Sequence, residues 1–171
     1  MQLVQRDPSS KILACTPSNA AADLLIERLA AAGLTVSQLL RLNARSREMK
    51  NIPEGVRPFS RSPELTGLLT YRVVLSTCSS AALLLKLKIR AGHFSHIIID
   101  EAAQVDEPLA LIPIAFFSTE DTNVVLAGDP NQLGPVIQSG PAAEAGLGKS
   151  YLERLMNISK IYGLGPQAGD T

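Results

Sequence analysis

Two short segments of this 171-residue chain constrain its fold more than any other feature. Residues 96–104 (HIIIDEAAQ) and 124–135 (VVLAGDPNQLGP) each begin with aliphatic side chains and then change abruptly to acidic and polar ones. This change is typical of a buried parallel strand that ends at the carboxyl edge of an α/β sheet, where ligands bind. It places Asp100 and Glu101 at that edge. A nucleoside triphosphatase needs such a pair, because one carboxylate holds Mg²⁺ and the next orients or deprotonates the attacking water.

The rest of the chain alternates strand-like and helix-like segments. We expect strands at 11–16, 39–42, 73–77, 97–100 and 124–127, and helices at 19–32, 81–88 and toward the end of 141–156. Ser18 or Asn19 can cap the helix over 19–32, whose apolar face should contain Leu24, Leu25 and Leu29. Repeated strand–helix alternation predicts an α/β fold with a parallel, doubly wound sheet.

Two segments lack such a pattern. Residues 43–63 are polar, contain three prolines and predict an irregular connection, and residues 163–171 predict a C-terminal loop. The longest apolar stretch, 109–117, is too short to span a membrane, so no membrane partner is expected. Cys15 and Cys78 lie in apolar runs and predict buried thiols in a reducing compartment, the cytoplasm or alternatively the nucleus.

The charge balance excludes a global attraction to polyanions. Sixteen basic residues match sixteen acidic ones, so any binding of nucleic acid must be local. Arg41, Arg45, Arg47 and Lys50 form one local basic cluster. We favour a solvated loop face for this cluster, and salt-sensitive contact with backbone phosphates is the alternative.

Four segments, in chain order, resemble the motifs of superfamily 1 helicases. Residues 12–23 resemble motif Ia, 74–80 the next nucleic-acid-contacting motif, 99–104 the Walker B motif II, and 126–135 motif III. Motif III, together with residues 150–155, resembles the nonsense-mediated-decay helicase branch. Within that branch, residues 41–44 and 162–166 are most similar to the Moloney leukaemia virus 10 type RNA helicases of RNA silencing. The resemblance covers nearly the whole chain.

The resemblance implies a RecA-like P-loop NTPase domain that uses ATP and Mg²⁺. By matching position, Asp100 would hold Mg²⁺ through water and Glu101 would be the catalytic base. Gln132 would contact the γ-phosphate, while Gly128 and Asp129 would lie in the same nucleotide-binding loop, which Asp129 helps to fix. The alternative is that Asp100 and Glu101 are two solvated carboxylates at a strand end and that Gln132 is an ordinary loop amide.

Two strand ends are candidates for contact with nucleic acid. They contain small hydroxyl and amide side chains beside a helix N-terminus, which attracts phosphate. The candidate residues are Thr16, Pro17, Ser18, Asn19, Ser76 and Thr77. A plain helix cap is the alternative for Ser18 and Asn19, and capping and phosphate contact are compatible.

Residues 143–150 (AEAGLGKS) fit a relaxed phosphate-loop pattern, but we reject this match. A phosphate loop follows a buried strand, and the preceding residues 138–142 (QSGPA) cannot form one. We therefore expect no nucleotide-binding role for Lys149. The family's phosphate loop would precede motif Ia, and its strand should neighbour the Asp100 strand, so we expect an unpaired edge and a gap in the core there.

These inferences predict an incomplete first motor domain over residues 1–171, with the phosphate-loop strand and the second motor domain missing. The expected function is that of a fragment of an ATP-dependent RNA helicase that moves on single-stranded RNA, with DNA left open. RNA-silencing or decay proteins are the expected partners. The alternative is a non-catalytic fragment that binds nucleic acid or a partner without ATP turnover. An unrelated acid–base enzyme would leave Gln132 unexplained.

Overall fold

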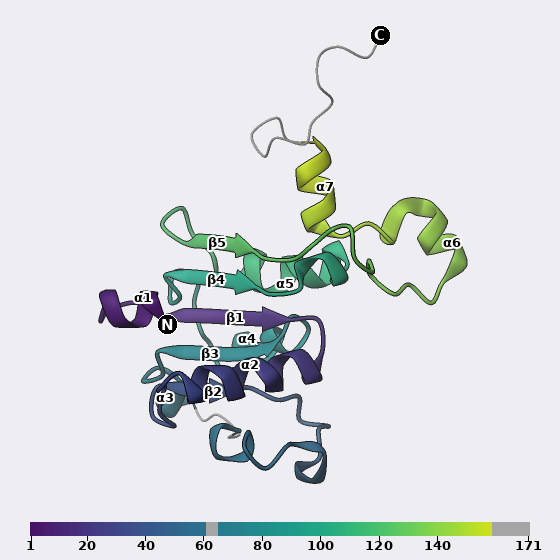
Figure 1. The fold of residues 1–171 in the computed structure, drawn as a ribbon. Coiled ribbons are helices and arrows are strands. Elements are labelled where there is room, and N and C mark those ends of the chain that lie inside the picture. Colours follow the sequence, from purple (N-terminus) through teal and green to yellow (C-terminus); the bar gives the residue numbers. More distant parts are fainter. Residues whose placement is uncertain (61–64, 159–171) are drawn as a thin grey trace.

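A five-stranded, all-parallel sheet forms the centre of the molecule (Figure 1). The computed structural model describes residues 1–60 and 65–158, so the predicted loop at 163–171 lies outside the described residues. The strands are β1 (Ile12–Thr16), β2 (Leu39–Arg41), β3 (Val73–Thr77), β4 (His96–Ile99) and β5 (Asn123–Leu126). Their spatial order is β2-β3-β1-β4-β5. All five strands were predicted, and β4 and β5 begin and end one residue earlier than expected.

Helices cover both faces of this sheet (Figure 1). They are α1 (Gln2–Arg6), α2 (Asn19–Ala31), α3 (Leu65–Leu68), α4 (Leu83–Lys86), α5 (Glu107–Phe117), α6 (Gly140–Ala142) and α7 (Tyr151–Ile158). Successive strand residues point to opposite faces: Leu13 joins the core under α4 and α5, and Ala14 joins the core under α2. The predicted doubly wound α/β architecture is confirmed.

The buried face of α2 differs from the prediction. Ser18 caps the helix as expected, because its Oγ accepts a hydrogen bond from the backbone N–H of Ala21 at 3.2 Å. However, Leu24 is 47% exposed, whereas Asp23 and Ile26 are buried. Leu25 and Leu29 pack against the α2-side core as expected, so the prediction is wrong for Leu24 only. Asp23 turns inward because it pairs with two arginines.

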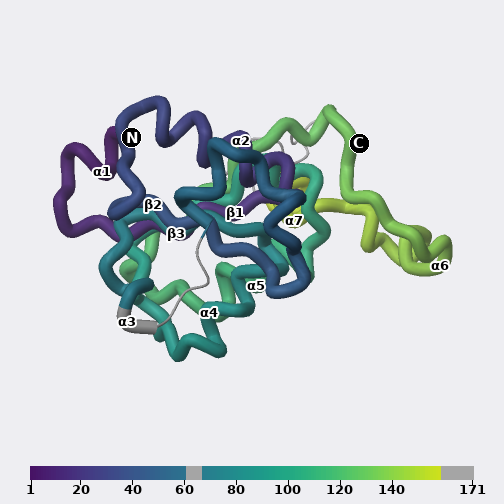
Figure 2. The backbone as a smooth tube through the Cα atoms, turned by 90° about the horizontal axis from the view of Figure 1, so that it is seen from below, coloured from purple at the N-terminus to yellow at the C-terminus, as the bar shows by residue number. Residues whose placement is uncertain are grey.

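The described parts of the segments that join β2 to β3 and β3 to β4 contain only short helical turns. Residues 43–60 include 3-10 turns at Met49–Asn51 and Arg57–Phe59, and Phe59 anchors this segment in the α2-side core. The helix expected over 81–88 is shorter, since a 3-10 turn at Ser80–Ala82 precedes the four-residue α4. The segment with α6 extends away from the sheet in both views (Figures 1 and 2).

The unpaired edge of the sheet is not where we expected it. The Asp100 strand β4 lies between β1 and β5, so the expectation of an open edge beside β4 is wrong. Among the described residues, β5 has a neighbour on one side only, and Val124 and Val125 are 40% and 45% exposed there. An apolar cavity of about 180 Å³ lies between α1, α2 and Ile98 of β4. Within the described residues, no helix is both long enough and apolar enough to cross a membrane.

Candidate functional site

A sharp turn after β4 presents the two predicted carboxylates. The backbone N–H of Asp100 donates to the carbonyl oxygen of Cys15 at 2.9 Å, which fixes the strand end against β1. Glu101 has a φ of 54° and a ψ of 38°, the left-handed conformation that costs a non-glycine residue roughly 1–2 kcal/mol. Its Oε2 accepts a hydrogen bond from Nε2 of Gln104 at 3.2 Å. The fold therefore maintains a strained turn that places consecutive carboxylates at the carboxyl edge of the sheet.

The loop after β5 is joined to this acidic turn through the backbone. Ala127 donates to the carbonyl of Ile99 at 2.8 Å and accepts from the N–H of Ala102 at 2.7 Å. A Cβ added to Gly128 would lie only 2.9 Å from the backbone nitrogen of Ala103. Only glycine allows this approach, so Gly128 has a packing role besides its predicted place near a nucleotide.

Asp129 and Gln132 are brought together in the same loop. Asp129 Oδ1 accepts from the backbone N–H of Asn131 at 2.9 Å, and Asp129 Oδ2 accepts from Nε2 of Gln132 at 3.2 Å. These hydrogen bonds, that from the Asn131 backbone first, lower the pKa of Asp129. The carboxylate thus stays ionised and holds the exposed Gln132 amide within the loop.

The residues of the acidic turn suit Mg²⁺ that arrives with a nucleotide. Among the described residues, no group of three His, Cys, Asp or Glu side chains could enclose a metal by itself. Mg²⁺ usually keeps several waters and takes one or two carboxylates together with substrate phosphates. Asp100 and Glu101 supply such carboxylates, and both are half-buried rather than enclosed.

The predicted contacts of two hydroxyl groups with nucleic acid need correction. Thr16 and Ser76 are both 0% exposed. Thr16 Oγ1 donates to the carbonyl of Ser18 at 2.9 Å, and Ser76 Oγ lies 3.7 Å from Sγ of Cys15. Both hydroxyl groups are held inside the sheet because the ends of β1 and β3 are covered by the turns that follow them. Direct contact with a nucleic acid is excluded for these two side chains in this conformation.

The remaining candidates lie closer to the surface. Ser18 and Asn19 are exposed at the N-terminus of α2, and Pro17 is half-buried. Thr77 is buried, and its Oγ1 accepts from the backbone N–H of Ser80 at 3.2 Å, which shapes the turn after β3. The ends of β1 and β3 are adjacent because their residues pair in register. The exposed part of the predicted contact surface is therefore the N-terminus of α2 beside this turn.

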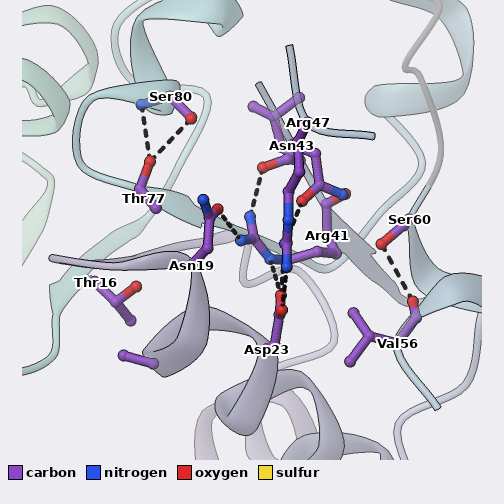
Figure 3. Close-up of polar contacts among 12 residues, drawn as sticks. Thr16, Asn19, Asp23, Arg41, Asn43, Arg47, Val56, Ser60, Thr77 and Ser80 are labelled. Atoms are coloured by element: carbon purple, nitrogen blue, oxygen red, sulfur yellow. Dashed lines mark hydrogen bonds and ion pairs between the residues drawn. The ribbon is translucent and has the colours of Figure 1, made fainter. Parts of the chain in front are cut away.

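A buried ion-pair network supports that surface (Figure 3). Arg41 is 0% exposed, and its Nε donates to Asp23 Oδ1 at 3.0 Å while its Nη2 donates to Asn19 Oδ1 at 2.8 Å. Arg47 Nη1 donates to Asp23 Oδ1 at 2.9 Å and to Asn43 Oδ1 at 2.8 Å. Burial raises the pKa of Asp23, but the hydrogen bonds from Arg47 and Arg41 outweigh it, so the pKa lies below its usual value.

The network also corrects the interpretation of the basic cluster. The predicted solvated face is wrong for Arg41 and Arg47, which are buried or nearly buried against Asp23. It holds for Arg45, which is exposed, and for Lys50, which pairs with Glu48 at the surface. The sequence analysis missed Asp23. The available signal was an aspartate in the middle of a helix otherwise rich in Ala and Leu.

The structure places the rejected phosphate-loop match, residues 143–150, in a described segment without the strand that a phosphate loop requires. Residues 143–147 continue directly from α6 as a helical turn that is kinked at Gly146 (φ 98°), and Lys149 is exposed. In the described segment that leads from β5 to Lys149, no strand comes directly before this turn. A phosphate loop joins a strand to a helix, so the geometry agrees with the rejection.

Comparison with known proteins gives consistent results. Residues 37–140, more than half of the chain, match the family described as "AAA domain". The chain is 43% identical over 152 residues to "RNA helicase Mov10l1" of Homo sapiens, and the match covers 88% of this chain and 13% of that protein. It is 40% identical over 170 residues to "Putative helicase MOV-10" of Gallus gallus, and the match covers 90% of this chain and 18% of that protein. It is 33% identical over 184 residues to "Probable RNA helicase armi" of Drosophila melanogaster, and the match covers 93% of this chain and 16% of that protein. The chain thus spans less than a fifth of the length of these relatives.

Proposed function

Since the chain belongs to the AAA-domain family, and within it to the superfamily 1 RNA helicases of the Moloney leukaemia virus 10 type, we propose that it forms part of an ATP-driven RNA helicase motor. The observation that carries the proposal is the joining of two loops at one sheet edge. Backbone hydrogen bonds connect the Asp100–Glu101 turn to the loop that contains Gly128 and Gln132.

We assign the steps of hydrolysis to these residues. Bound Mg²⁺ and ATP supply the cation and the γ-phosphoryl group that passes to water. Asp100 would hold the cation through water. Glu101 would accept the proton of the attacking water, as a positioned carboxylate can. Gln132, held by Asp129, would contact the γ-phosphate.

We propose that single-stranded RNA lies along the N-terminus of α2 and the turn after β3. The exposed Ser18 and Asn19 support this placement, as do the backbone N–H groups of the first helical turn, which attract phosphate. The human and fly relatives are named RNA helicases, which supports RNA rather than DNA as the ligand. A role in RNA silencing or decay is part of this proposal and follows from the family resemblance. We place the protein in the cytoplasm, with the nucleus as the alternative.

The proposal is tested in a protein that carries this segment together with a phosphate loop and a second motor domain. Glu101→Gln should keep ATP binding but reduce hydrolysis at least about 100-fold, because an amide cannot accept the proton. Glu144→Gln, an exposed residue of the outlying segment, is the matched control and should hydrolyse ATP normally. Retention of more than about a tenth of normal turnover by Glu101→Gln would contradict the assigned base.

A non-catalytic RNA-binding role is the second candidate for the 171-residue chain itself. It is favoured by the context of Lys149, whose loop lacks the strand-to-helix arrangement of a phosphate loop. We expect the 171-residue chain to show little or no ATPase activity, because the phosphate-loop-like segment at 143–150 lacks the strand-to-helix geometry that holds ATP phosphates. Assays of phosphate release with and without RNA distinguish the two roles, and RNA-stimulated turnover would exclude the non-catalytic one.

A further inference from the structure

A cavity lies beside the proposed RNA-binding surface and has no part in ATP hydrolysis. Its volume is about 220 Å³, and it is formed by the loop after β2 and by helix α4. Leu42, Leu83 and Leu87 supply apolar walls, while Arg45 and Met49 lie at its exposed side. Asn43, Arg47 and Ser60 also line it, so the cavity combines apolar walls with polar and cationic groups.

Both walls continue from the loops that carry the candidate RNA contacts. Helix α4 follows the turn that begins at Thr77 and Ser80. The opposite wall begins at Leu42, directly after Arg41, whose guanidinium binds Asn19 at the N-terminus of α2 (Figure 3). A strand bound along that surface would pass the entrance of the cavity.

The cavity has the size and chemistry for an aromatic ring. A cavity of roughly 150 Å³ lined by aliphatic side chains holds benzene, so 220 Å³ has room for a heterocyclic base with its exocyclic groups. Met49 is 56% exposed, and methionine sulfur makes favourable contacts with aromatic rings. Arg45 has no ion-pair or hydrogen-bond partner among the described residues, so its guanidinium is available for a base edge or a neighbouring phosphate.

We propose that this cavity receives one unstacked nucleobase of a single-stranded RNA whose backbone follows the N-terminus of α2 and the turn after β3. The inference rests on the proposed RNA binding and adds a base-binding site to it. Proteins commonly recognise single-stranded RNA through bases that leave the stack. Met49 and the leucine walls would contact the faces of the base, and Arg45 would approach it from the entrance.

The test compares two RNA oligonucleotides of equal length, one with normal bases and one with abasic sites along its centre. Fluorescence anisotropy with the full 171-residue chain should show about tenfold weaker binding of the abasic strand, the loss expected for one well-held base. Ala44→Leu, which adds volume to the cavity wall, should weaken binding of the normal strand similarly. Ala115→Leu on the exposed face of α5 is the matched control and should change nothing.

A second pair of variants covers the case in which Ala44→Leu fails to fold. Met49→Glu places a charge at the entrance on an exposed side chain and should weaken binding of the normal strand but not of the abasic strand. Val136→Glu, at a position that is 91% exposed and outside the cavity, should weaken neither selectively. An oligonucleotide with 4-thiouridine should cross-link to residues 42–49 or 83–87.

The possible failures are distinguishable. Equal binding of normal and abasic strands, with no effect of Met49→Glu, overturns the base-binding site but leaves backbone binding of RNA intact. That result would point to an apolar side chain of a protein partner as the occupant. Absence of binding by either strand overturns both the base-binding site and the proposed RNA contact of this chain.

Discussion

The buried carboxylate of Asp23 should be one of the largest single contributors to the stability of this chain. It receives hydrogen bonds from Arg41 Nε at 3.0 Å and from Arg47 Nη1 at 2.9 Å, and the Arg41 side chain has no exposure at all. Asp23→Asn keeps the shape of the side chain but removes the negative charge. It also turns one acceptor into an amide donor that faces a guanidinium.

The size of the effect follows from these contacts. A hydrogen bond to a charged group contributes about 1.5–3 kcal/mol, and breaking a buried ion pair by removing one partner costs about 3–5 kcal/mol. The amide retains one oxygen for Arg41, so we expect a loss near the lower end, about 3 kcal/mol. That is a large part of the roughly 5–15 kcal/mol by which a domain is stable.

Urea denaturation of the 171-residue chain, followed by circular dichroism, measures this loss. Glu48→Gln is the control, because Glu48 also forms an ion pair but is 60% exposed, so its loss should cost under about 1 kcal/mol. Since folding lowers the pKa of Asp23 from its ordinary value of 3.8, its ionisation contributes stability that is present above pH 3.8 and is lost as pH falls further. The difference between wild type and Asp23→Asn should therefore be constant near neutral pH and shrink below 3.8. A neutral-pH difference no larger than that of Glu48→Gln would refute the reasoning.

Three further predictions concern the loops of the site. Glu101→Gly should raise the free energy of unfolding by about 1 kcal/mol because it relieves the left-handed strain, whereas Glu101→Gln should leave it unchanged in the same denaturation assay. Gly128→Ala should lower it by about 1–3 kcal/mol, since the added Cβ would lie 2.9 Å from the Ala103 nitrogen; an unchanged midpoint would show that the loops can separate freely. In a protein with a complete motor, Lys149→Ala should leave ATP affinity unchanged in a fluorescent-nucleotide titration, and a large loss would restore the rejected phosphate-loop match.

The strands were predictable because each is a short, continuous apolar run bounded by polar residues. Helix α5 was not predicted, since its sequence EPLALIPIAFF is apolar from Pro108 onward and gives no helical period. Local signals for it exist: Asp106 caps the helix by accepting from the Leu109 N–H at 3.0 Å, and Pro108 lies in the first turn. The capping pattern would have been more informative here than hydrophobic periodicity.

The site was predictable where one segment supplies it and not where distant segments meet. The acidic turn and the Gly128–Gln132 loop each follow directly from a strand end. The burial of Asp23 depends on Arg41, 18 residues away, and on Arg47, 24 residues away. That meeting requires β2 to pair with β3, so that both strands lie under α2. Strand order is a tertiary property, and the same dependence explains why the open edge was assigned to β4 instead of β5.

The strand order also connects the Asp100–Glu101 turn with the turn after β3 through two consecutive residues of β1. The carbonyl of Cys15 accepts from the N–H of Asp100 at 2.9 Å on one side of the strand. The carbonyl of Thr16 accepts from the N–H of Cys78 at 3.0 Å on the other side. Only one peptide bond separates the two carbonyl groups, so the two turns are anchored to adjacent residues of β1. The central position of β1 in the sheet therefore gives the proposed nucleotide site and the proposed RNA-binding surface a short physical connection.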